Sequence, residues 1–349
     1  MKNEAEHSSC KSVLYIIVVI TMESANCESV AHHLQHWLNL RRITLTPTDC
    51  LCFGYFLSCV CNTTVGEFKV NLSKCRIRDQ GCKYLVSGLH KCLDTHRTVT
   101  TTLSIVLFDN NIKQQGVSDL SKLLQTDCIK TLNLDSNYDV SDKAVCIIAE
   151  ELKHNTSLRT LRLVGCGYKS KGVECLASAL TTNSSLEVLC CGGLPREYVI
   201  EQLAHALRVN HSLKVLHLGN CGMTDEHLES LARSLQHNKS LQQLNISNGF
   251  MYQLVHSPAT RTKYKCIEYP NTITKKGVSV LTECLKKNNS LLELILPADF
   301  ESSTTTVQVA VNEARKRSGL PFIKWHVSLF LSSSCRDSCA TWPAWTTCR

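Results

Sequence analysis

Hydrophobic residues recur along this chain in an order that predicts a short strand followed by a helix. Residues 158–166 read Leu-x-x-Leu-x-Leu-x-x-Cys, and residues 213–221 read the same. The Leu-x-Leu alternation points apolar side chains to one face, as a half-buried strand requires. Similar frames return about every 28 residues, with two longer intervals, which predicts stacked repeats. The frames begin at Leu40, Glu67, Thr102, Ile129, Leu158, Leu186, Leu213, Leu241, Leu291 and Leu320.

The second half of each unit carries the spacing of an amphipathic helix. Leucines fall four residues apart, which places them on one stripe of a helix. A single strand and helix cannot bury their own apolar faces, so the units must stack with parallel strands inside and helices outside. The wider helical layer then curves the stack. The leucine pairs are Leu85/Leu89, Leu120/Leu124, Leu176/Leu180, Leu203/Leu207, Leu231/Leu235 and Leu281/Leu285.

These units resemble the long form of the leucine-rich repeat, shared by ribonuclease inhibitor, the Ran GTPase-activating proteins and the NOD-like receptors. The resemblance covers roughly residues 40–328. It implies an α/β fold: a curved, horseshoe-shaped solenoid with parallel strands on the concave face and helices on the convex face. It also implies that the chain acts by binding other proteins rather than by catalysis.

The chain divides into a long repeat domain and two short ends. We expect an N-terminal segment of uncertain structure at 1–29, a domain of about ten repeats at 30–330, and a poorly ordered tail at 331–349. The predicted caps are an amphipathic helix with Val30, Leu34, Trp37 and Leu38, and a last helix at 307–317.

The N-terminal apolar run does not predict a membrane anchor. It covers only residues 13–20, whereas a helix needs about 20 apolar residues to cross a bilayer. A cleaved leader is the alternative, but Glu4 and Glu6 offset Lys2 and Lys11 in a region that should be positive. We therefore interpret the run as a strand or helix packed on the first repeat, and we predict no membrane partner.

Cysteine is frequent, with 21 residues against an aromatic content of only 6%. Such a density suggests extracellular disulfides, but the positions of the cysteines within the repeats favour buried thiols. Cys75, Cys166 and Cys221 occupy the position that Asn110 and Asn137 occupy in other repeats, where a thiol or amide can satisfy turn groups. We therefore expect a reducing, cytoplasmic location. Four more predicted buried thiols replace or adjoin core leucines: Cys146, Cys175, Cys191 and Cys284.

One cysteine cluster could bind zinc, since Cys50, Cys52, Cys59 and Cys61 form two Cys-x-Cys pairs. Apolar residues surround them where the helix of the first repeat should lie, so packing is the favoured interpretation. We predict no metal and no cofactor.

Asn-x-Ser/Thr motifs recur three residues before strand frames and resemble glycosylation signals. Their position instead suggests that each Asn ends a helix in the left-handed conformation that Asn tolerates. A structural role is therefore predicted for Asn155, Asn183, Asn210, Asn238 and Asn288.

No catalytic motif is found in the sequence. It contains no Gly-x-x-x-x-Gly-Lys-Ser/Thr phosphate loop, no His-Glu-x-x-His and no Gly-x-Ser-x-Gly. The 14 histidines are scattered, and several adjoin helix-ending turns where solvated caps are expected. We predict that the chain is not an enzyme.

The strand residues that point away from the core form a mostly neutral, polar concave surface suited to a protein partner. Arg162 and His217 are the predicted anchors, although simple solvation would also explain them. The candidate binding residues on this face are Asn133, Asp135, Arg162, His217, Asn220 and Asn245.

An insertion at 250–272 is a second candidate surface. It lengthens one unit by about 22 residues and mixes aromatic with basic side chains, a composition suited to a protein or acidic surface. A long loop can also be merely tolerated. The candidate binding residues here are Tyr252, Arg261, Lys263 and Tyr264.

The net charge of +8 is concentrated in the C-terminal part, because 251–349 carries 13 Lys and Arg against 7 Asp and Glu, or +6. No continuous basic stripe with stacked aromatics accompanies this charge, so nucleic acid is not a predicted partner.

The resemblance favours the ligand-sensing or autoinhibitory repeat region of a NOD-like innate immune receptor. In that family an ATP-binding NACHT domain precedes the repeats. We therefore expect a receptor fragment, a truncated product or a repeat-only relative, with a nucleotide-binding domain supplied in trans as a candidate partner. The alternative is a regulator of an enzyme, similar to the Ran GTPase-activating proteins or to ribonuclease inhibitor.

Overall fold

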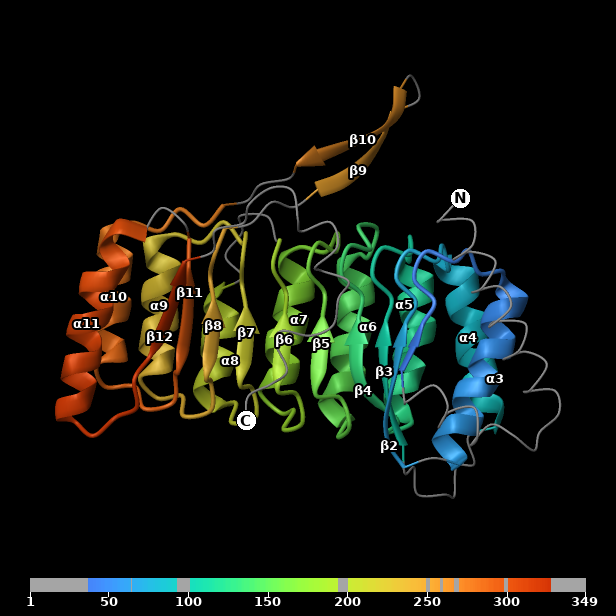
Figure 1. Ribbon diagram of the computed structural model, residues 1–349, viewed down its shortest axis with the longest axis horizontal. Coiled ribbons are helices and arrows are strands. Elements are labelled where there is room, and N and C mark those ends of the chain that lie inside the picture. Colours follow the sequence, from blue (N-terminus) through green and yellow to red (C-terminus); the bar gives the residue numbers. More distant parts are fainter. Residues whose placement is uncertain are drawn as a thin grey trace.

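A computed structural model describes residues 37–63, 65–92, 101–193, 200–248, 252–257, 260–266, 270–297 and 301–327. Strands line one side of the molecule and helices cover the other (Figure 1). This arrangement is the curved α/β solenoid that the repeats predict. The N-terminal segment 1–29 and the tail 331–349 lie outside the described residues.

Ten parallel strands form one sheet in the described residues, and their spatial order follows the chain, with β11 next to β8 (Figure 1). Each strand is short because the chain turns outward after a few core residues. The strands are β1 (Trp37–Asn39), β2 (Gly66–Asn71), β3 (Thr101–Val106), β4 (Ile129–Asn133), β5 (Thr160–Arg162), β6 (Val188–Cys190), β7 (Val215–His217), β8 (Gln243–Asn245), β11 (Glu293–Leu296) and β12 (Lys324–Val327).

One apolar residue from every strand lies in a single row across the sheet and faces the helices. This row is buried along its whole length, because each repeat shields the apolar face of its neighbour. The row consists of Leu38, Val70, Ile105, Leu132, Leu161, Leu189, Leu216, Leu244, Leu294 and Trp325.

Helices connect the strands and bury the predicted leucine stripes. One leucine pair departs from the prediction, since Leu120 is in α5 but Leu124 is in a 3₁₀ turn, η1 (Lys122–Gln125). The helices are α3 (Pro47–Thr63), α4 (Arg78–Cys92), α5 (Gln114–Ser121), α6 (Asp142–His154), α7 (Ser170–Leu180), α8 (Ile200–Val209), α9 (Asp225–Leu235), α10 (Lys275–Leu285) and α11 (Glu301–Arg317).

The first and last repeat frames were wrong in register. Leu38 aligns with Val70, so the first frame begins before Leu40, and Trp37 and Leu38 belong to a strand rather than to the predicted helix. At the other end Trp325 aligns with Leu294, which shifts the frame that began at Leu320. Alternating apolar residues fit two registers equally well where the described sheet offers a neighbouring strand on one side only.

The recurrent Asn residues join each repeat to the previous one through their buried side-chain amides. Asn183 donates from Nδ2 to the carbonyls of Leu152 (2.7 Å) and Asn155 (3.1 Å), and its Oδ1 accepts from Ser185 and Leu186 amides. The structural role is thus correct, but the left-handed cap is wrong. None of these Asn residues has positive φ. Equivalent bonds are made by Asn155, Asn210, Asn238 and Asn288.

Arg315 ends this amide ladder in the last described helix. Its fully buried guanidinium donates to the carbonyls of Leu285 (2.8 Å), Asn288 and Pro321 (2.6 Å), where the next repeat would supply an Asn. A charged hydrogen-bonding group therefore satisfies the carbonyls at the end of the stack.

A second ladder follows the strands and confirms the shared Asn and Cys slot. Asn137 Oδ1 accepts from the backbone amides of Asn110 and Ile112, both at 3.0 Å. Cys75 and Cys166 occupy equivalent positions, and their thiols donate to the carbonyls of the preceding repeats, at 3.0 and 3.2 Å respectively. Desolvation raises the pKa of Cys75 to about 12, so it remains a thiol.

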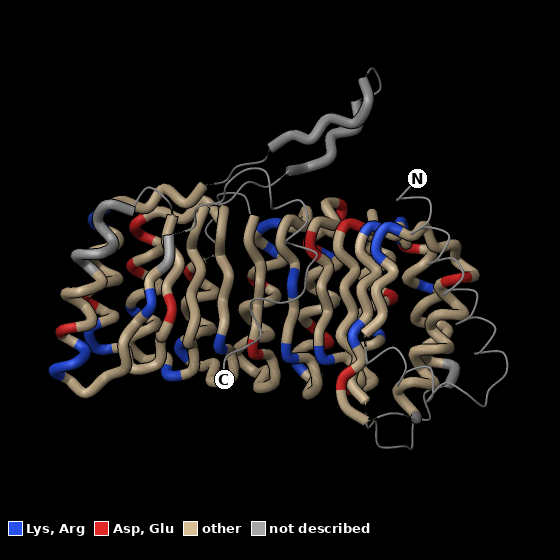
Figure 2. The backbone as a smooth tube through the Cα atoms, viewed as in Figure 1, with Lys and Arg blue, Asp and Glu red and all other residues tan. Residues whose placement is uncertain are grey.

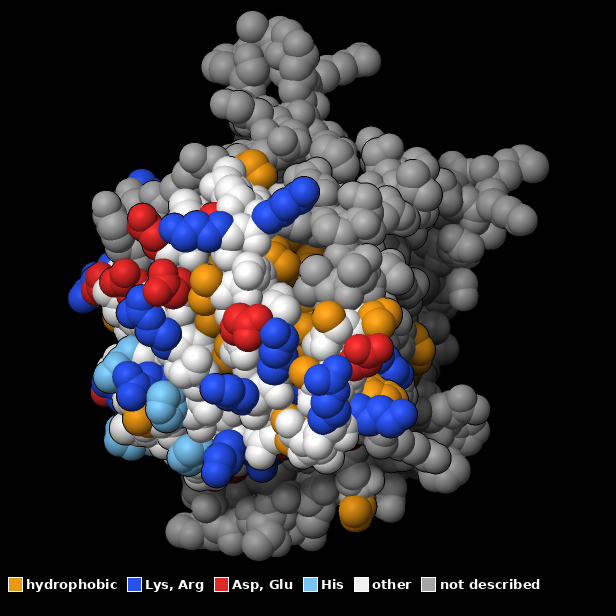
Figure 3. All heavy atoms as spheres, turned by 90° about the vertical axis from the view of Figure 1, so that its left-hand side faces the viewer, with side chains coloured by type: hydrophobic (Ala, Val, Ile, Leu, Met, Phe, Trp, Pro, Cys, Tyr) orange, Lys and Arg blue, Asp and Glu red, His pale blue; other side chains and the backbone are white. Residues whose placement is uncertain are grey.

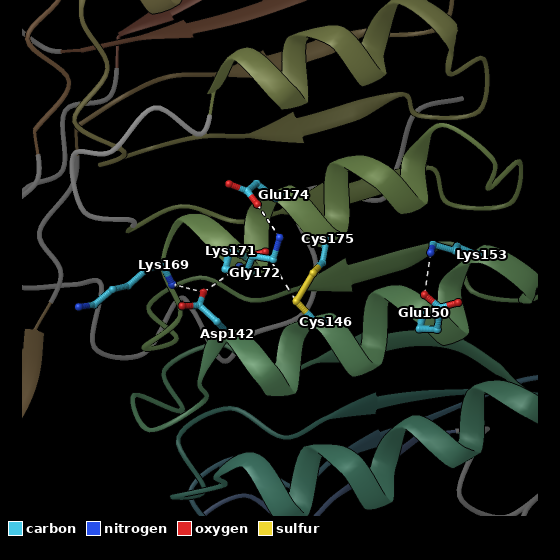
Figure 4. The surroundings of a disulfide bond; sticks show 9 residues. All are labelled: Asp142, Cys146, Glu150, Lys153, Lys169, Lys171, Gly172, Glu174 and Cys175. Carbon is cyan, nitrogen blue, oxygen red and sulfur yellow. Dashed lines mark hydrogen bonds and ion pairs between the residues drawn. A yellow bond between two sulfur atoms is a disulfide. The ribbon is translucent and has the colours of Figure 1, made fainter.

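Cys146 of α6 and Cys175 of α7 form a disulfide bond, so the prediction of buried free thiols is wrong for this pair (Figure 4). The two residues are 29 apart in sequence, close to the repeat period, and their Cα atoms are 5.1 Å apart. Stacking brings equivalent positions of adjacent helices together, and both side chains are half-buried. The other assigned slots hold buried free cysteines: Cys75, Cys166, Cys191, Cys221 and Cys284.

Candidate protein-binding surface

The concave candidates lie side by side because the strands are in register. Asn133 of β4 pairs with Arg162 of β5, which pairs with Cys190 of β6, and the row continues to His217 and Asn245. Parallel strands are about 4.8 Å apart, so these positions form one continuous row. The structure therefore brings the predicted strand candidates together.

Arg162 and Asp135 form the best-defined charged pair on this face. Arg162 donates from Nε to Asp135 Oδ2 at 2.8 Å, and its Nη2 is 2.7 Å from the same oxygen. The other carboxylate oxygen accepts from the backbone amide of Val164 at 2.7 Å. The Asp135 side chain is only 7% exposed, whereas that of Arg162 is 30% exposed. Arg162, one of the two predicted anchors, is thus an oriented member of an ion pair.

His217 lies next to this pair along the row. Burial and, to a lesser extent, the positive charge of Arg162 together lower the pKa of His217 from 6.5 to about 4. Cys190 lies on β6, between Arg162 on β5 and His217 on β7, and its sulfur is 3.3 Å from Arg162 Nη1. The imidazole is therefore neutral near pH 7, and only Arg162 supplies positive charge here.

Three asparagines on this side have structural roles that limit what they can offer a partner. Asn133 Oδ1 accepts from the amide of Asp135 at 2.8 Å, and Asn245 accepts from Ser247 at 3.0 Å. Asn220 is buried and has a φ of 55°, which Asn adopts more readily than most residues. The concave face is therefore less exposed than predicted, with Asn133, Asp135 and Asn220 all buried.

Two further ion pairs extend the face toward the N-terminal repeats. Lys74 pairs with Asp109 at 3.8 Å and lies over the ring of Phe108. Burial raises the pKa of Asp109, and Lys74 opposes that rise. A second pair joins Glu67 of β2 to Lys130 of β4 at 2.7 Å. Lys74, Glu67 and Lys130 were not predicted as binding residues, although an alignment of the repeat frames would have placed them beside residues of the neighbouring strands.

The insertion forms a separate antiparallel hairpin, β9 (Tyr252–Ser257) and β10 (Thr260–Cys266), outside the ten-stranded sheet (Figure 1). Its register places Tyr264 opposite Leu254 and Cys266 opposite Tyr252, with an irregularity between Thr260 and Lys263. The candidates Tyr252, Arg261, Lys263 and Tyr264 therefore belong to the hairpin and not to the row of β4–β8.

Asn248 and Asn271 close the base of the hairpin. The Asn271 amide donates to Asn248 Oδ1 at 2.7 Å, and Asn248 Nδ2 donates to the Asn271 carbonyl at 3.1 Å. Asn271 then takes the ladder slot of its repeat, accepting from Cys221 and Met223 amides. The frame therefore resumes after the insertion with Asn271 and Ile273. The sequence signal for this return of the frame is the spacing Asn271-x-Ile273, which repeats that of Asn110 and Ile112.

The cysteine cluster of α3 packs into the core. Cys50 and Cys61 are buried, while Cys52 and Cys59 are half-buried. Phe53 and Phe56 stack nearby with ring centroids 5.9 Å apart. Within the described ranges, no three His, Cys, Asp or Glu side chains are arranged to hold a metal ion. Among the helices that the structure describes, none has the length and apolar character needed to span a bilayer.

Comparison with known proteins adds family information to this geometry. A family model described as a leucine-rich repeat matches 154–177 and 209–232. Human "NACHT, LRR and PYD domains-containing protein 14" is 26% identical over 72% of this chain and 20% of its own length. Mouse ribonuclease inhibitor is 30% identical over 42% of this chain and 32% of the inhibitor. The human centrosomal protein of 78 kDa is 26% identical over 37% of this chain and 21% of that protein. This chain thus spans about a fifth of the first relative.

Proposed function

Because the chain is a leucine-rich repeat protein of the ribonuclease-inhibitor type, similar to the repeat regions of NACHT, LRR and PYD domains-containing proteins, we propose that it is a protein-binding module. Its binding surface is the concave row from Asn133 to Asn245, extended by the hairpin. The observation that carries this proposal is the oriented pair that Arg162, the second member of the row, forms with Asp135.

The pair suits recognition for a physical reason. Both Asp135 oxygens are engaged, so Arg162 is held in place before a partner arrives. Binding to an ordered side chain costs less conformational entropy than binding to a flexible one. Arg is also among the residues that contribute most to protein interfaces. Asn245, which is half-buried, adds an amide on the same face.

The finer proposal is a cytoplasmic sensing or autoinhibitory repeat region, whose partner is a NACHT domain supplied in trans. The similarity to NACHT, LRR and PYD domains-containing proteins supports it. The purified NACHT region of the human protein 14 is a direct probe. We expect it to bind this chain when binding is measured by biolayer interferometry. The absence of binding at micromolar concentration would reject the NACHT partner.

The variant for this experiment must leave no buried charge unpaired. Arg162→Ala alone would strand the Asp135 carboxylate, which costs several kcal/mol. Asp135→Asn with Arg162→Gln removes both charges together. The matched control is Lys171→Gln with Glu174→Gln, which removes an exposed ion pair from α7 (Figure 4). We expect at least a tenfold loss of affinity for the concave variant only. Equal affinities would place the interface elsewhere.

The alternative is an enzyme inhibitor, which the mouse ribonuclease inhibitor favours at 30% identity. An inhibitor of a basic enzyme needs an acidic concave face. In the described part of this face, Asp135 is neutralised by Arg162 and Asp109 by Lys74. We therefore expect no inhibition of pancreatic ribonuclease A by an equimolar amount of this chain. Stoichiometric inhibition would establish the alternative.

A further inference from the structure

Exposed basic residues line the edge where each helix ends and the next strand begins. Figure 2 shows them along the lower edge, and Figure 3 shows basic and histidine side chains gathered low on the C-terminal end. On four consecutive turns, from α8–β7 to α11–β12, five of these residues are exposed and form no ion pair within the described residues. We call this set the basic rim: Arg208, Lys239, Lys287, Lys316 and Lys324.

Helix electrostatics do not fully explain the rim. Cations near a helix C-terminus offset the negative end of the helix dipole. On the same edge that role is filled by residues paired with a carboxylate one turn earlier, such as Arg233 with Glu229 and Lys286 with Glu283. Lys239 follows its helix, and Lys324 begins a strand, so neither lies in a last helical turn. Arg208 and Lys316 do lie in the last turns of α8 and α11, so the helix dipole accounts for part of the rim but not for Lys239 or Lys324.

The buried ladder holds the rim in place. Lys239 follows Asn238 and Lys287 precedes Asn288, whose amides are bonded into the previous repeat. Lys316 follows Arg315, which closes the ladder. Packed helices lie about 10 Å apart, so charges on consecutive turns form a row about 30 Å long. A row of like charges produces a positive potential along this edge, which attracts an oppositely charged partner.

Exposed apolar side chains alternate with these charges. Val209 is 48% exposed beside Arg208, Leu292 is 38% exposed, and Phe322 is 61% exposed two residues before Lys324. Leu292 and Phe322 lie on adjacent turns, because Lys324 donates to the Leu292 carbonyl at 2.7 Å. Single exposed apolar residues are ordinary, but these three share the edge that carries the unpaired charges.

We propose that the basic rim binds a protein segment that combines acidic with apolar residues. The separated charges match carboxylates on such a segment, and the apolar side chains between them match its hydrophobic positions. A nucleic acid offers no apolar side chains and carries far denser charge, one per roughly 1.7 Å of duplex. The rim lies where the helices end and the strands begin. The concave row consists of the last residues of β4 to β8, and the hairpin leaves from the end of β8. This surface is therefore separate from the concave row.

The test uses a fluorescein-labelled 20-residue peptide of Glu with Leu at every fourth position, followed by fluorescence anisotropy. The rim variant combines Arg208→Gln, Lys239→Gln, Lys287→Gln and Lys316→Gln. The control variant has the same net charge and changes four exposed lysines of the N-terminal half to Gln: Lys83, Lys113, Lys143 and Lys171. All eight side chains are on the surface, so both variants should fold.

We expect at least tenfold weaker peptide binding for the rim variant and less than a twofold change for the control. Phe322→Ser should weaken binding several-fold without changing its salt dependence. Equal losses in the two charge variants would overturn the proposal, since net charge alone would then explain binding. Tighter binding to phosphatidylserine vesicles or to a 20-nucleotide poly-dT strand at equal salt would also overturn it.

Discussion

Buried polar side chains on the concave side and in the turns hold this protein together, and their ionisation makes its stability depend on pH. His217 illustrates this, because its pKa is lowered from 6.5 to about 4 by burial and by Arg162. The unfolded chain therefore binds a proton at higher pH than the folded chain does. Stability should be complete above about pH 6.5 and fall as the pH drops toward 4.

The first prediction concerns this titration. His217→Gln should remove part of the acid sensitivity, so the variant should lose roughly 1–3 kcal/mol less unfolding free energy than the parent between pH 7 and pH 4.5. Urea titrations at several pH values measure this difference. Parallel pH profiles for the two proteins would show that His217 titrates normally in the folded state.

The second prediction concerns the amide ladder. Asn238 donates to the carbonyls of Leu207 and Asn210 and accepts from Ser240 and Leu241. Asn238→Ala should lower the unfolding free energy by about 3 kcal/mol, because several buried groups lose their partners. The exposed neighbour Asn289 provides the control, and its change to Ala should cost less than about 0.5 kcal/mol. Similar losses from both variants in urea denaturation would contradict the ladder.

At the element scale, repeated units were predictable while interruptions were not. The periodic spacing of apolar residues located β2 to β8, because the frame of each of these repeats had to match the frames of the repeats on both sides. Within the described residues, Leu38 and Trp325 have a neighbouring strand on one side only, and their frames were misplaced. Residues 250–270 carry no repeat pattern, so the hairpin did not follow from periodicity, and only the Asn-x-Ile spacing at Asn271 marks the return of the frame.

The disulfide shows the limit of reading one repeat at a time. Cys146 and Cys175 look like core residues within their own helices, but stacking places them against each other between α6 and α7. The third prediction is that Cys146→Ser with Cys175→Ser lowers the unfolding free energy by about 2–3 kcal/mol, since a loop of this length is no longer closed. The parent in dithiothreitol should behave like the variant.

Alkylation supplies the independent check on this bond. Without reduction, the unfolded parent should leave Cys146 and Cys175 unmodified by iodoacetamide in mass spectra, whereas Cys284 should react. Alkylation of all three residues would show that the bond is absent in the isolated protein.

At the scale of the whole molecule, the solenoid consists of repeats that contact only their neighbours. The fourth prediction is that Leu216→Ala lowers the unfolding free energy by about 2–5 kcal/mol, because this fully buried leucine belongs to the continuous apolar row. Hydrogen exchange should increase in β6, β7 and β8 more than in β2. A uniform increase along the chain would indicate that the repeats unfold as one unit.

The candidate site was predictable only in part at this scale. Repeat alignment placed Asn133, Arg162, His217 and Asn245 on one face, as the register shows. It did not reveal that Arg162 pairs with Asp135, because that contact depends on the turn after β4 and on the Val164 amide. The same turn geometry buries Asn133 and Asn220, which alternation alone would leave exposed.

The most direct test of the central claim is photo-crosslinking from the concave face. A benzoylphenylalanine residue replaces Asn245, and a second protein carries it at the convex Lys171; both are irradiated in cell extract. If the concave row is the binding surface, position 245 should give discrete crosslinked protein bands that fade when Asp135→Asn and Arg162→Gln are added, and position 171 should give none of these bands. Identical bands from both positions, or bands that persist in the double variant, would contradict it.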